Sequence, residues 1–142
     1  MDKSNKLFVV TSAPHIRSED STRSLMLDVL IALLPAAVLS VYTFGPRAAV
    51  QIAVCTAACV FFEWLYIRLM KRDPGVDDLS AAVTGVLLAF NLPAAAPLWL
   101  GLVGSAFAIV VVKQLYGGIG KNIFNPALAA RVFLTLSWPG YM

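Results

Sequence analysis

The chain has 142 residues, of which 59% are hydrophobic and only 13% are charged, and its mean hydropathy is +0.78. Soluble domains carry about 25% charged residues, so this composition excludes an ordinary soluble domain and indicates a membrane protein. The net charge of +3 does not form the basic face that a nucleic-acid-binding protein requires.

The first 23 residues form a polar segment of mixed charge. The segment lacks a short apolar core followed by a small-residue cleavage site, so we do not expect a cleavable signal peptide. His15, in T-S-A-P-H-I-R-S, is the only histidine of the chain. A lone histidine is seldom a metal ligand or a catalytic base, so we expect His15 to contact a loop or a partner.

Four strongly apolar segments can be compared with the ~20 residues that a helix needs to cross the hydrocarbon core. They cover residues 24–43, 47–67, 97–116 and 126–142. A fifth, Leu79–Leu92, is shorter, contains Ser80, Thr84 and Gly85, and stops at Pro93. Short segments interrupted by Gly or Pro are typical of discontinuous helices that line a binding site. The sequence therefore predicts an all-α polytopic protein with about five transmembrane segments, one of them a short broken helix.

Two acidic residues fall inside the first two spans. Asp28 lies one turn inside the first span and Glu63 lies near the end of the second. An ionisable group within a span suggests an ion path, because a charge at the bilayer centre costs at least ~2.5 kcal/mol. Pairing with the interfacial residues Arg23 and Arg68 is the competing interpretation, and both remain open.

The second span also contains Cys55 and Cys59, which are four residues apart and share one face of a helix. Two thiols are half of a metal site, and no polar neighbours accompany them. We expect both to be packing residues. No constellation for hydrolysis or metal catalysis occurs in the chain.

The basic residues predict the topology. Nine lie before the first span, after the second, or between the fourth and fifth, whereas the opposite side has only Arg47. The positive-inside rule then places the N-terminus in the cytoplasm, and five crossings place the C-terminus outside the inner membrane. The chain stops at S-W-P-G-Y-M, directly after a span. We therefore expect residues 24–142 to be the first structural repeat of a longer, inverted-repeat subunit.

The loop G-G-I-G-K-N-I-F-N-P-A-L, residues 117–128, holds the remaining polar cluster. It fails the Walker pattern, because Leu115 replaces the first glycine and Asn122 replaces Ser or Thr. It also fails the dinucleotide fingerprint, because Ile123 replaces the third glycine. Asn125 suits the N-cap of the last helix, with Pro126 in its first turn. The amides of Asn122 and Asn125 suit a flat heterocycle better than a phosphate, although capping alone would also explain Asn125.

Several blocks of the chain resemble one known family. They are S-A-P-H-I-R-S, L-D-V-L-I-A-L-L-P-A, A-V-T-G-V-L-L-A-F-N-L-P and V-K-Q-L-Y-G-G-I-G-K-N-I-F-N-P-A-L-A-A-R. In this order they resemble the RnfD component of the Rnf complex and, more distantly, the NqrB component of the sodium-pumping NADH:quinone reductase. The resemblance covers nearly the whole chain from Thr11.

The resemblance implies a membrane subunit of a complex that moves electrons between ferredoxin and NAD while driving Na⁺ or H⁺ across the membrane. It also implies flavins. A non-covalent riboflavin would contact Asn122 and Asn125, with Thr84 as a weaker third residue. We further infer that Lys121 adds a positive charge near the ring, where it would favour a reduced, anionic flavin.

One expected feature is missing. The family carries FMN on a threonine in an S-G-A-T-like motif after the fifth span, and no such motif occurs in this chain; Thr84, in V-T-G-V, does not match it. Other subunits of the complex and the bilayer are the implied partners. A solute channel or secondary transporter, and a scaffold subunit without its own cofactor, are the alternative functions.

Overall fold

The computed structural model describes residues 22–71, 79–116 and 123–142, and these ranges contain helices and no strand. The all-α prediction is therefore confirmed. The helices are α1 (Thr22–Phe44), α2 (Pro46–Leu69), α3 (Ser80–Asn91), α4 (Leu98–Ala106), the π-helix η1 (Phe107–Gln114), α5 (Pro126–Ser137) and the short 3₁₀-helix η2 (Pro139–Tyr141).

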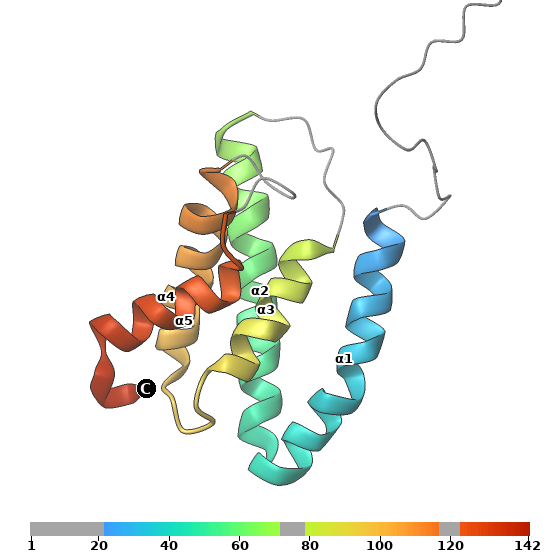
Figure 1. Ribbon diagram of the computed structural model, residues 1–142, viewed down its shortest axis with the longest axis vertical. Helices are drawn as coiled ribbons and strands as arrows, with labels where there is room; N and C mark the ends of the chain where they lie inside the picture. Colours follow the sequence, from blue (N-terminus) through green and yellow to red (C-terminus); the bar gives the residue numbers. More distant parts are fainter. Residues whose placement is uncertain (1–21, 72–78, 117–122) are drawn as a thin grey trace, which may run out of the picture.

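The first two helices form a long antiparallel hairpin (Figure 1). They contain 23 and 24 residues, or about 35 Å at 1.5 Å per residue, which exceeds the ~30 Å hydrocarbon core. Gly45 makes the turn at φ +80°, a conformation that glycine adopts without strain, and Pro46 begins α2. Within the described residues, these two helices have the length and composition to cross a membrane.

The predicted short helix is present, and a second short helix accompanies it. α3 has 12 residues and ends before Pro93, as expected. The last segment was expected to span from Pro126 to the end of the chain, but α5 also has only 12 residues. Because proline disfavours a helical residue before it, Pro139 ends the helix at Ser137. Each helix is about 18 Å long, so neither crosses the hydrocarbon core alone.

The segment predicted over residues 97–116 forms two kinds of helix in succession. Its first half is the α-helix α4, and its second half is the π-helix η1, which ends at Gln114. The backbone N–H of Leu115 donates to the carbonyl of Val110 at 3.2 Å, the i→i+5 spacing of a π-helix. In Figure 1 this segment runs beside α2, while α5 lies obliquely across it.

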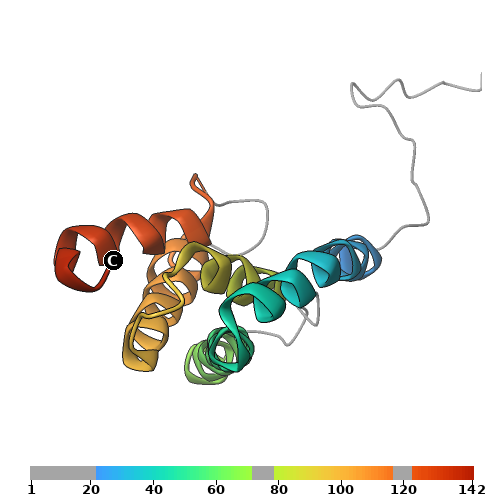
Figure 2. The same cartoon turned by 90° about the horizontal axis from the view of Figure 1, so that it is seen from below.

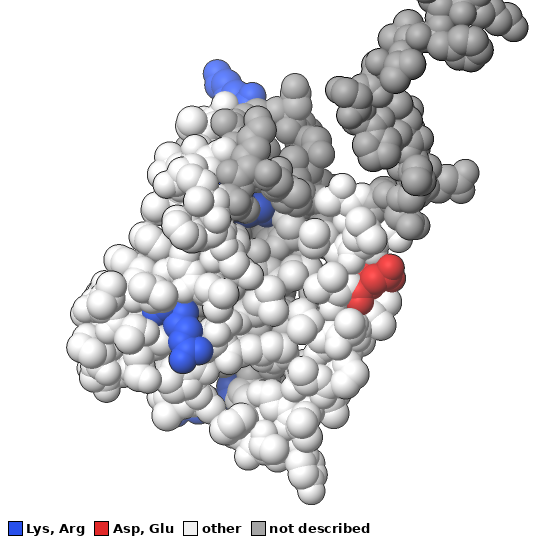
Figure 3. Space-filling view, viewed as in Figure 1, with Lys and Arg blue, Asp and Glu red and all other residues white. Residues whose placement is uncertain are grey.

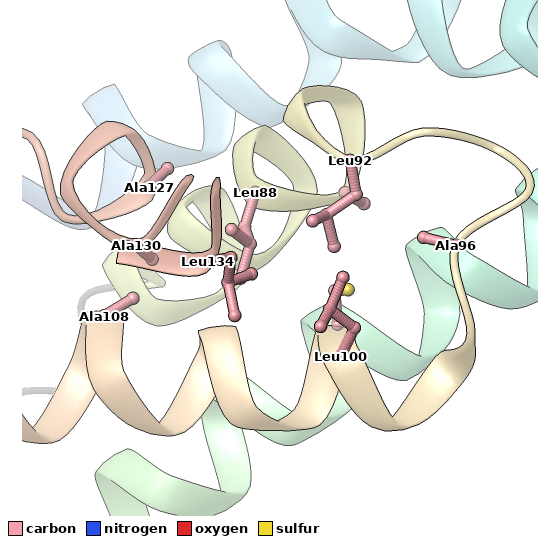
Figure 4. Close-up of a cluster of buried hydrophobic side chains, with 10 residues drawn as sticks. Leu88, Leu92, Ala96, Leu100, Ala108, Ala127, Ala130 and Leu134 are labelled. Atoms are coloured by element: carbon pink, nitrogen blue, oxygen red, sulfur yellow. The ribbon is translucent and has the colours of Figure 1, made fainter. Parts of the chain in front are cut away.

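The core lies where α3, α4 and α5 meet on α2 (Figure 4). Leu88, Leu100 and Leu134 are fully buried. In Figure 4, Leu88 of α3 lies against Leu134 of α5, and Leu100 of α4 points toward Leu92. Cys55 and Cys59 are buried free thiols in the two hydrophobic clusters, which agrees with the packing role expected for them.

Two features show how the helices pack. α3 crosses α2 so closely that a Cβ added to Gly85 would lie 2.5 Å from the Cα of Thr56. By contrast, α1 has no buried residue and stands at the edge of the helices, as the view from below shows (Figure 2). Close approach through glycine and an apolar outer helix are both common in membrane bundles.

Candidate functional site

The two short helices begin beside the same cavity. The cavity has a volume of about 380 Å³ and receives side chains from α1, α3, η1 and α5. Its polar wall comes from α3, η1 and the first residues of α5. The lining residues are Met26, Ser80, Val83, Thr84, Leu87, Lys113, Ile123, Phe124, Asn125 and Pro126. Half-length helices that begin at a shared cavity are the arrangement found at binding sites of many transporters.

One residue of the cavity wall, Lys113, belongs to a buried ion pair. The ammonium Nζ of Lys113 donates to Oε1 of Glu63 and to Oγ of Ser80. The Nε2 amide of Gln114 donates to the same Glu63 oxygen at 3.1 Å. The side chains of Lys113 and Glu63 are only 2% and 10% exposed. Charges this deeply buried are tolerated only when they are paired and hydrogen-bonded.

The backbone around the pair is irregular. Leu79, which precedes Ser80, has φ +58°, and a left-handed conformation at a non-glycine residue costs about 1–3 kcal/mol. Lys113 and Gln114 are the last two residues of the π-helix η1. π-Helical turns occur frequently at functional sites. The strained residue precedes Ser80, and the π-helix ends with Lys113 and Gln114; these three side chains form the hydrogen-bonded cluster with Glu63, so we take this cluster as the candidate functional site.

Thr84 and Asn125, two of the predicted flavin contacts, lie on this cavity. Asn125 caps α5 by accepting a hydrogen bond from the Ala127 N–H at 3.0 Å, with Pro126 in the first turn, which confirms the predicted cap. This bond uses the Oδ1 atom, so the side-chain amide can still donate from Nδ2. Thr84 is buried, and its hydroxyl donates to the Ser80 carbonyl at 2.9 Å.

Two other hollows help to delimit the site. A mainly apolar cavity of about 630 Å³ lies between η1 and α5 and shares Phe124 and Asn125 with the first cavity. The largest hollow described, about 1050 Å³, lies between α1 and α2 and is lined mainly by apolar side chains, with Thr56 among them. A membrane protein presents such apolar grooves to lipid or to other helices, so we assign no chemistry to the largest one.

The structure tests whether Glu63 and Asp28 pair with Arg68 and Arg23. Glu63 pairs with Lys113, so the expected pair with Arg68 is wrong; Arg68 instead lies over the Trp64 ring at 5.1 Å. Asp28 is exposed on α1, and Figure 3 shows an acidic group over that helix on a face with few charges. Among the described residues, Asp28 forms no ion pair with Arg23.

Some predicted residues cannot be placed. Asn122, Lys121 and His15 lie outside the described residues, so their expected contacts stay predictions.

Sequence reasoning missed three residues of the site: Lys113, Gln114 and the hydroxyl of Ser80. Lys113 was counted among the cytoplasmic loop charges, whereas it is buried inside the bundle. Without it the count of basic residues is eight against one, and the predicted orientation is unchanged. The signal was present, because Lys113 falls within the apolar run 97–116.

Long apolar helices, half-length helices and a buried ion pair beside a cavity define a polytopic membrane protein with an internal polar site. The model of the NQR2, RnfD, RnfE family matches residues 9–142. The chain belongs to this family, and it is a membrane protein.

Curated relatives agree with this assignment. The chain is 55% identical over 133 residues to the subunit designated D of the Na(+)-translocating ferredoxin:NAD(+) oxidoreductase complex of Acetobacterium woodii, covering 94% of this chain and 42% of that protein. It is 45% identical over 137 residues to the subunit designated D of the ion-translocating oxidoreductase complex of Shewanella loihica, covering 95% of this chain and 39% of that protein. The chain therefore spans about two fifths of the length of these relatives.

Proposed function

We propose that this chain forms part of a membrane subunit of a redox-driven ion pump, which couples electron transfer between ferredoxin and NAD to the translocation of Na⁺ or H⁺. The names of the relatives support this proposal. The observation that carries it within the structure is the buried Glu63–Lys113 pair, whose lysine lines a cavity with one polar wall. A carboxylate inside a membrane domain is a natural ligand for a translocated cation. The subunit would lie in the inner membrane with its N-terminus in the cytoplasm, bound to the other subunits of the complex.

The cavity also fits the flavin expected from the resemblance. Its polar wall offers the Asn125 amide, the Thr84 oxygen and the Lys113 ammonium, and its other wall is apolar. A planar ring with carbonyl and N–H groups along one edge needs such an arrangement of donors and acceptors on one side and apolar contacts on the other. Asn122 and Lys121 remain part of this proposal from the sequence. A bound flavin would supply the electron transfer, whereas the chain would hold and orient the ring and keep a positive charge beside it.

The cofactor proposal is tested in the complex that contains the full-length subunit, by extraction and chromatography of its non-covalent flavin. Asn125→Ala removes both the helix cap and the side-chain amide, whereas Asn125→Ser keeps a capping oxygen and removes only the amide. We expect both variants to lose most of the non-covalent flavin. We expect the same loss in Asn122→Ala. Loss in Asn125→Ala alone would reduce Asn125 to a helix cap.

The same preparations separate the alternative functions. A complex without flavin absorbance would favour a solute channel or transporter. Full flavin content and unchanged electron transfer after substitution of Asn122, Asn125 and Thr84 would favour a scaffold subunit.

The ion-path proposal needs its own variant. Glu63→Gln should stop ion uptake into proteoliposomes that contain the full complex, while the flavin content stays at the wild-type level. Asp28→Asn is the companion variant for the second candidate acid. Because Asp28 is exposed and outside the cavity, we expect a smaller effect there. Normal ion transport by Glu63→Gln in an assembled complex would remove Glu63 from the path.

A further inference from the structure

The ammonium of Lys113 is held by side-chain oxygen atoms. Its Nζ atom contacts a carboxylate oxygen of Glu63 and the hydroxyl oxygen of Ser80, from two different helices. Sodium and other hard monovalent cations are bound by oxygen atoms of this kind. The positive charge that neutralises the buried carboxylate therefore belongs to the protein itself. It is carried by Lys113 of η1, 50 residues after Glu63 in the chain.

We propose that Glu63, Ser80 and Gln114 form a binding site for an alkali cation such as Na⁺, and that Lys113 fills this site as a built-in competitor. The inference rests on the proposed role of Glu63 in the ion path and adds three residues to it. The site holds either the ammonium or the cation, because two positive charges beside one buried carboxylate would leave an uncompensated charge in the low-dielectric interior.

Gln114 is suited to both states. Its Nε2 now donates to Glu63 at 3.1 Å, and rotation of the amide would present its oxygen to a cation instead. Gln114 and Lys113 are consecutive residues at the end of the π-helix. A change of that turn between π and α geometry would move both side chains together, and such turns are points of conformational adjustment in helices.

The cavity provides the place to which Lys113 can move. Lys113 and Ser80 line its wall, so the flexible lysine side chain can turn from Glu63 toward the cavity without crossing a hydrophobic layer. A ligand with negative charge in the cavity would draw the ammonium away and open Glu63 to a cation. Occupancy of the two sites is then positively coupled, and the coupling acts equally in both directions.

The test measures how accessible Glu63 is in the complex with the full-length subunit. Dicyclohexylcarbodiimide enters the bilayer and modifies protonated carboxyl groups, and mass spectrometry counts the label on Glu63. The wild-type protein should label slowly, because the Lys113 ammonium occupies the buried carboxylate oxygen that the reagent has to reach. In Lys113→Gln we expect labelling about tenfold faster, the effect of losing a charged hydrogen-bond partner, and we expect added NaCl to slow it where choline chloride does not.

Three variants complete the design. Lys113→Arg keeps a tethered cation and should label slowly, like the wild type. Glu63→Gln removes the target and should not label at this position. Ser80→Ala keeps the ion pair, so it tests the proposal even where Lys113→Gln fails to assemble; we expect faster labelling than in the wild type and weak protection by NaCl.

Two results would overturn the proposal. One is labelling of Lys113→Gln and Ser80→Ala at the wild-type rate, which would mean that Lys113 does not limit access of the reagent to Glu63. The other is fast labelling that neither Na⁺ nor K⁺ slows, which would mean that the opened site binds no alkali cation. The proposed function fails separately, if Glu63→Gln supports normal ion transport.

Discussion

Gly85 provides a sharp test of the helix packing. Substitution with alanine would place a methyl carbon 2.5 Å from the Cα of Thr56 and 2.9 Å from the carbonyl oxygen of Cys55. Carbon atoms in contact normally lie about 3.5–4.0 Å apart, so α2 and α3 would have to separate by about 1 Å. Both obstructing atoms belong to the backbone, and no side-chain rotation can relieve the clash.

The expected cost follows from two opposing effects. Overpacking destabilises a protein by about 1–3 kcal/mol, and an obstruction by backbone belongs at the upper end. Alanine in place of glycine within a helix recovers about 1 kcal/mol. We therefore expect Gly85→Ala to lower the free energy of unfolding by about 2 kcal/mol, measured for the full-length subunit in detergent by thermal or denaturant-induced unfolding.

Two matched glycines serve as controls. Gly104→Ala would meet the Cδ1 atom of Leu134 at 2.8 Å, the end of a side chain that can move, and Gly140→Ala would meet no atom within 4 Å. The expected order of stability is Gly140→Ala, then Gly104→Ala, then Gly85→Ala. If Gly85→Ala proves as stable as Gly104→Ala, the close crossing of α2 and α3 is wrong.

Two further predictions concern the core and the ion pair. Leu88→Ala, at a fully buried site, should cost about 2–5 kcal/mol of unfolding free energy, whereas Leu136→Ala, 79% exposed, should cost little in detergent; equal losses would contradict the core described for α3, α4 and α5. Glu63→Gln alone should cost about 3 kcal/mol, because the Lys113 ammonium stays buried without its counter-charge. The double variant Glu63→Gln, Lys113→Met should recover most of this lost free energy of unfolding, measured by the same unfolding experiment. A double variant less stable than the single one would argue against a buried pair.

Local signals in the sequence predicted several of the helix ends. The limits of the apolar segments 24–43 and 47–67 lie within two residues of the ends of α1 and α2, and Asn125 and Pro126 predict the start of α5, which the structure has. Pro139 carried the signal that α5 would end early. That signal was outweighed by the apolar composition after Pro126, which continues through the aromatic residues Trp138 and Tyr141.

The flavin contacts and the ion path could be predicted only as residue types. Thr84 and Asn125 are 41 residues apart in the sequence, and their meeting at one cavity depends on how α3 and α5 pack. The π-helix has no recognised sequence signal in this segment. It brings Lys113 and Gln114 together at Glu63, so the most distinctive part of the site was missed.

The sequence by itself determined the class of protein, the ends of α1 and α2, the short third helix and the cap of α5, because hydrophobicity, proline, glycine and capping act within a few residues. Only the tertiary structure decided which charge neutralises Glu63. Ion pairing in a membrane interior depends on which helices lie side by side, and helices that are apolar on all sides give no face from which their neighbours can be read. For that reason the sequence suggested Arg68, five residues away, as one possible partner, whereas the structure pairs Glu63 with Lys113, 50 residues away.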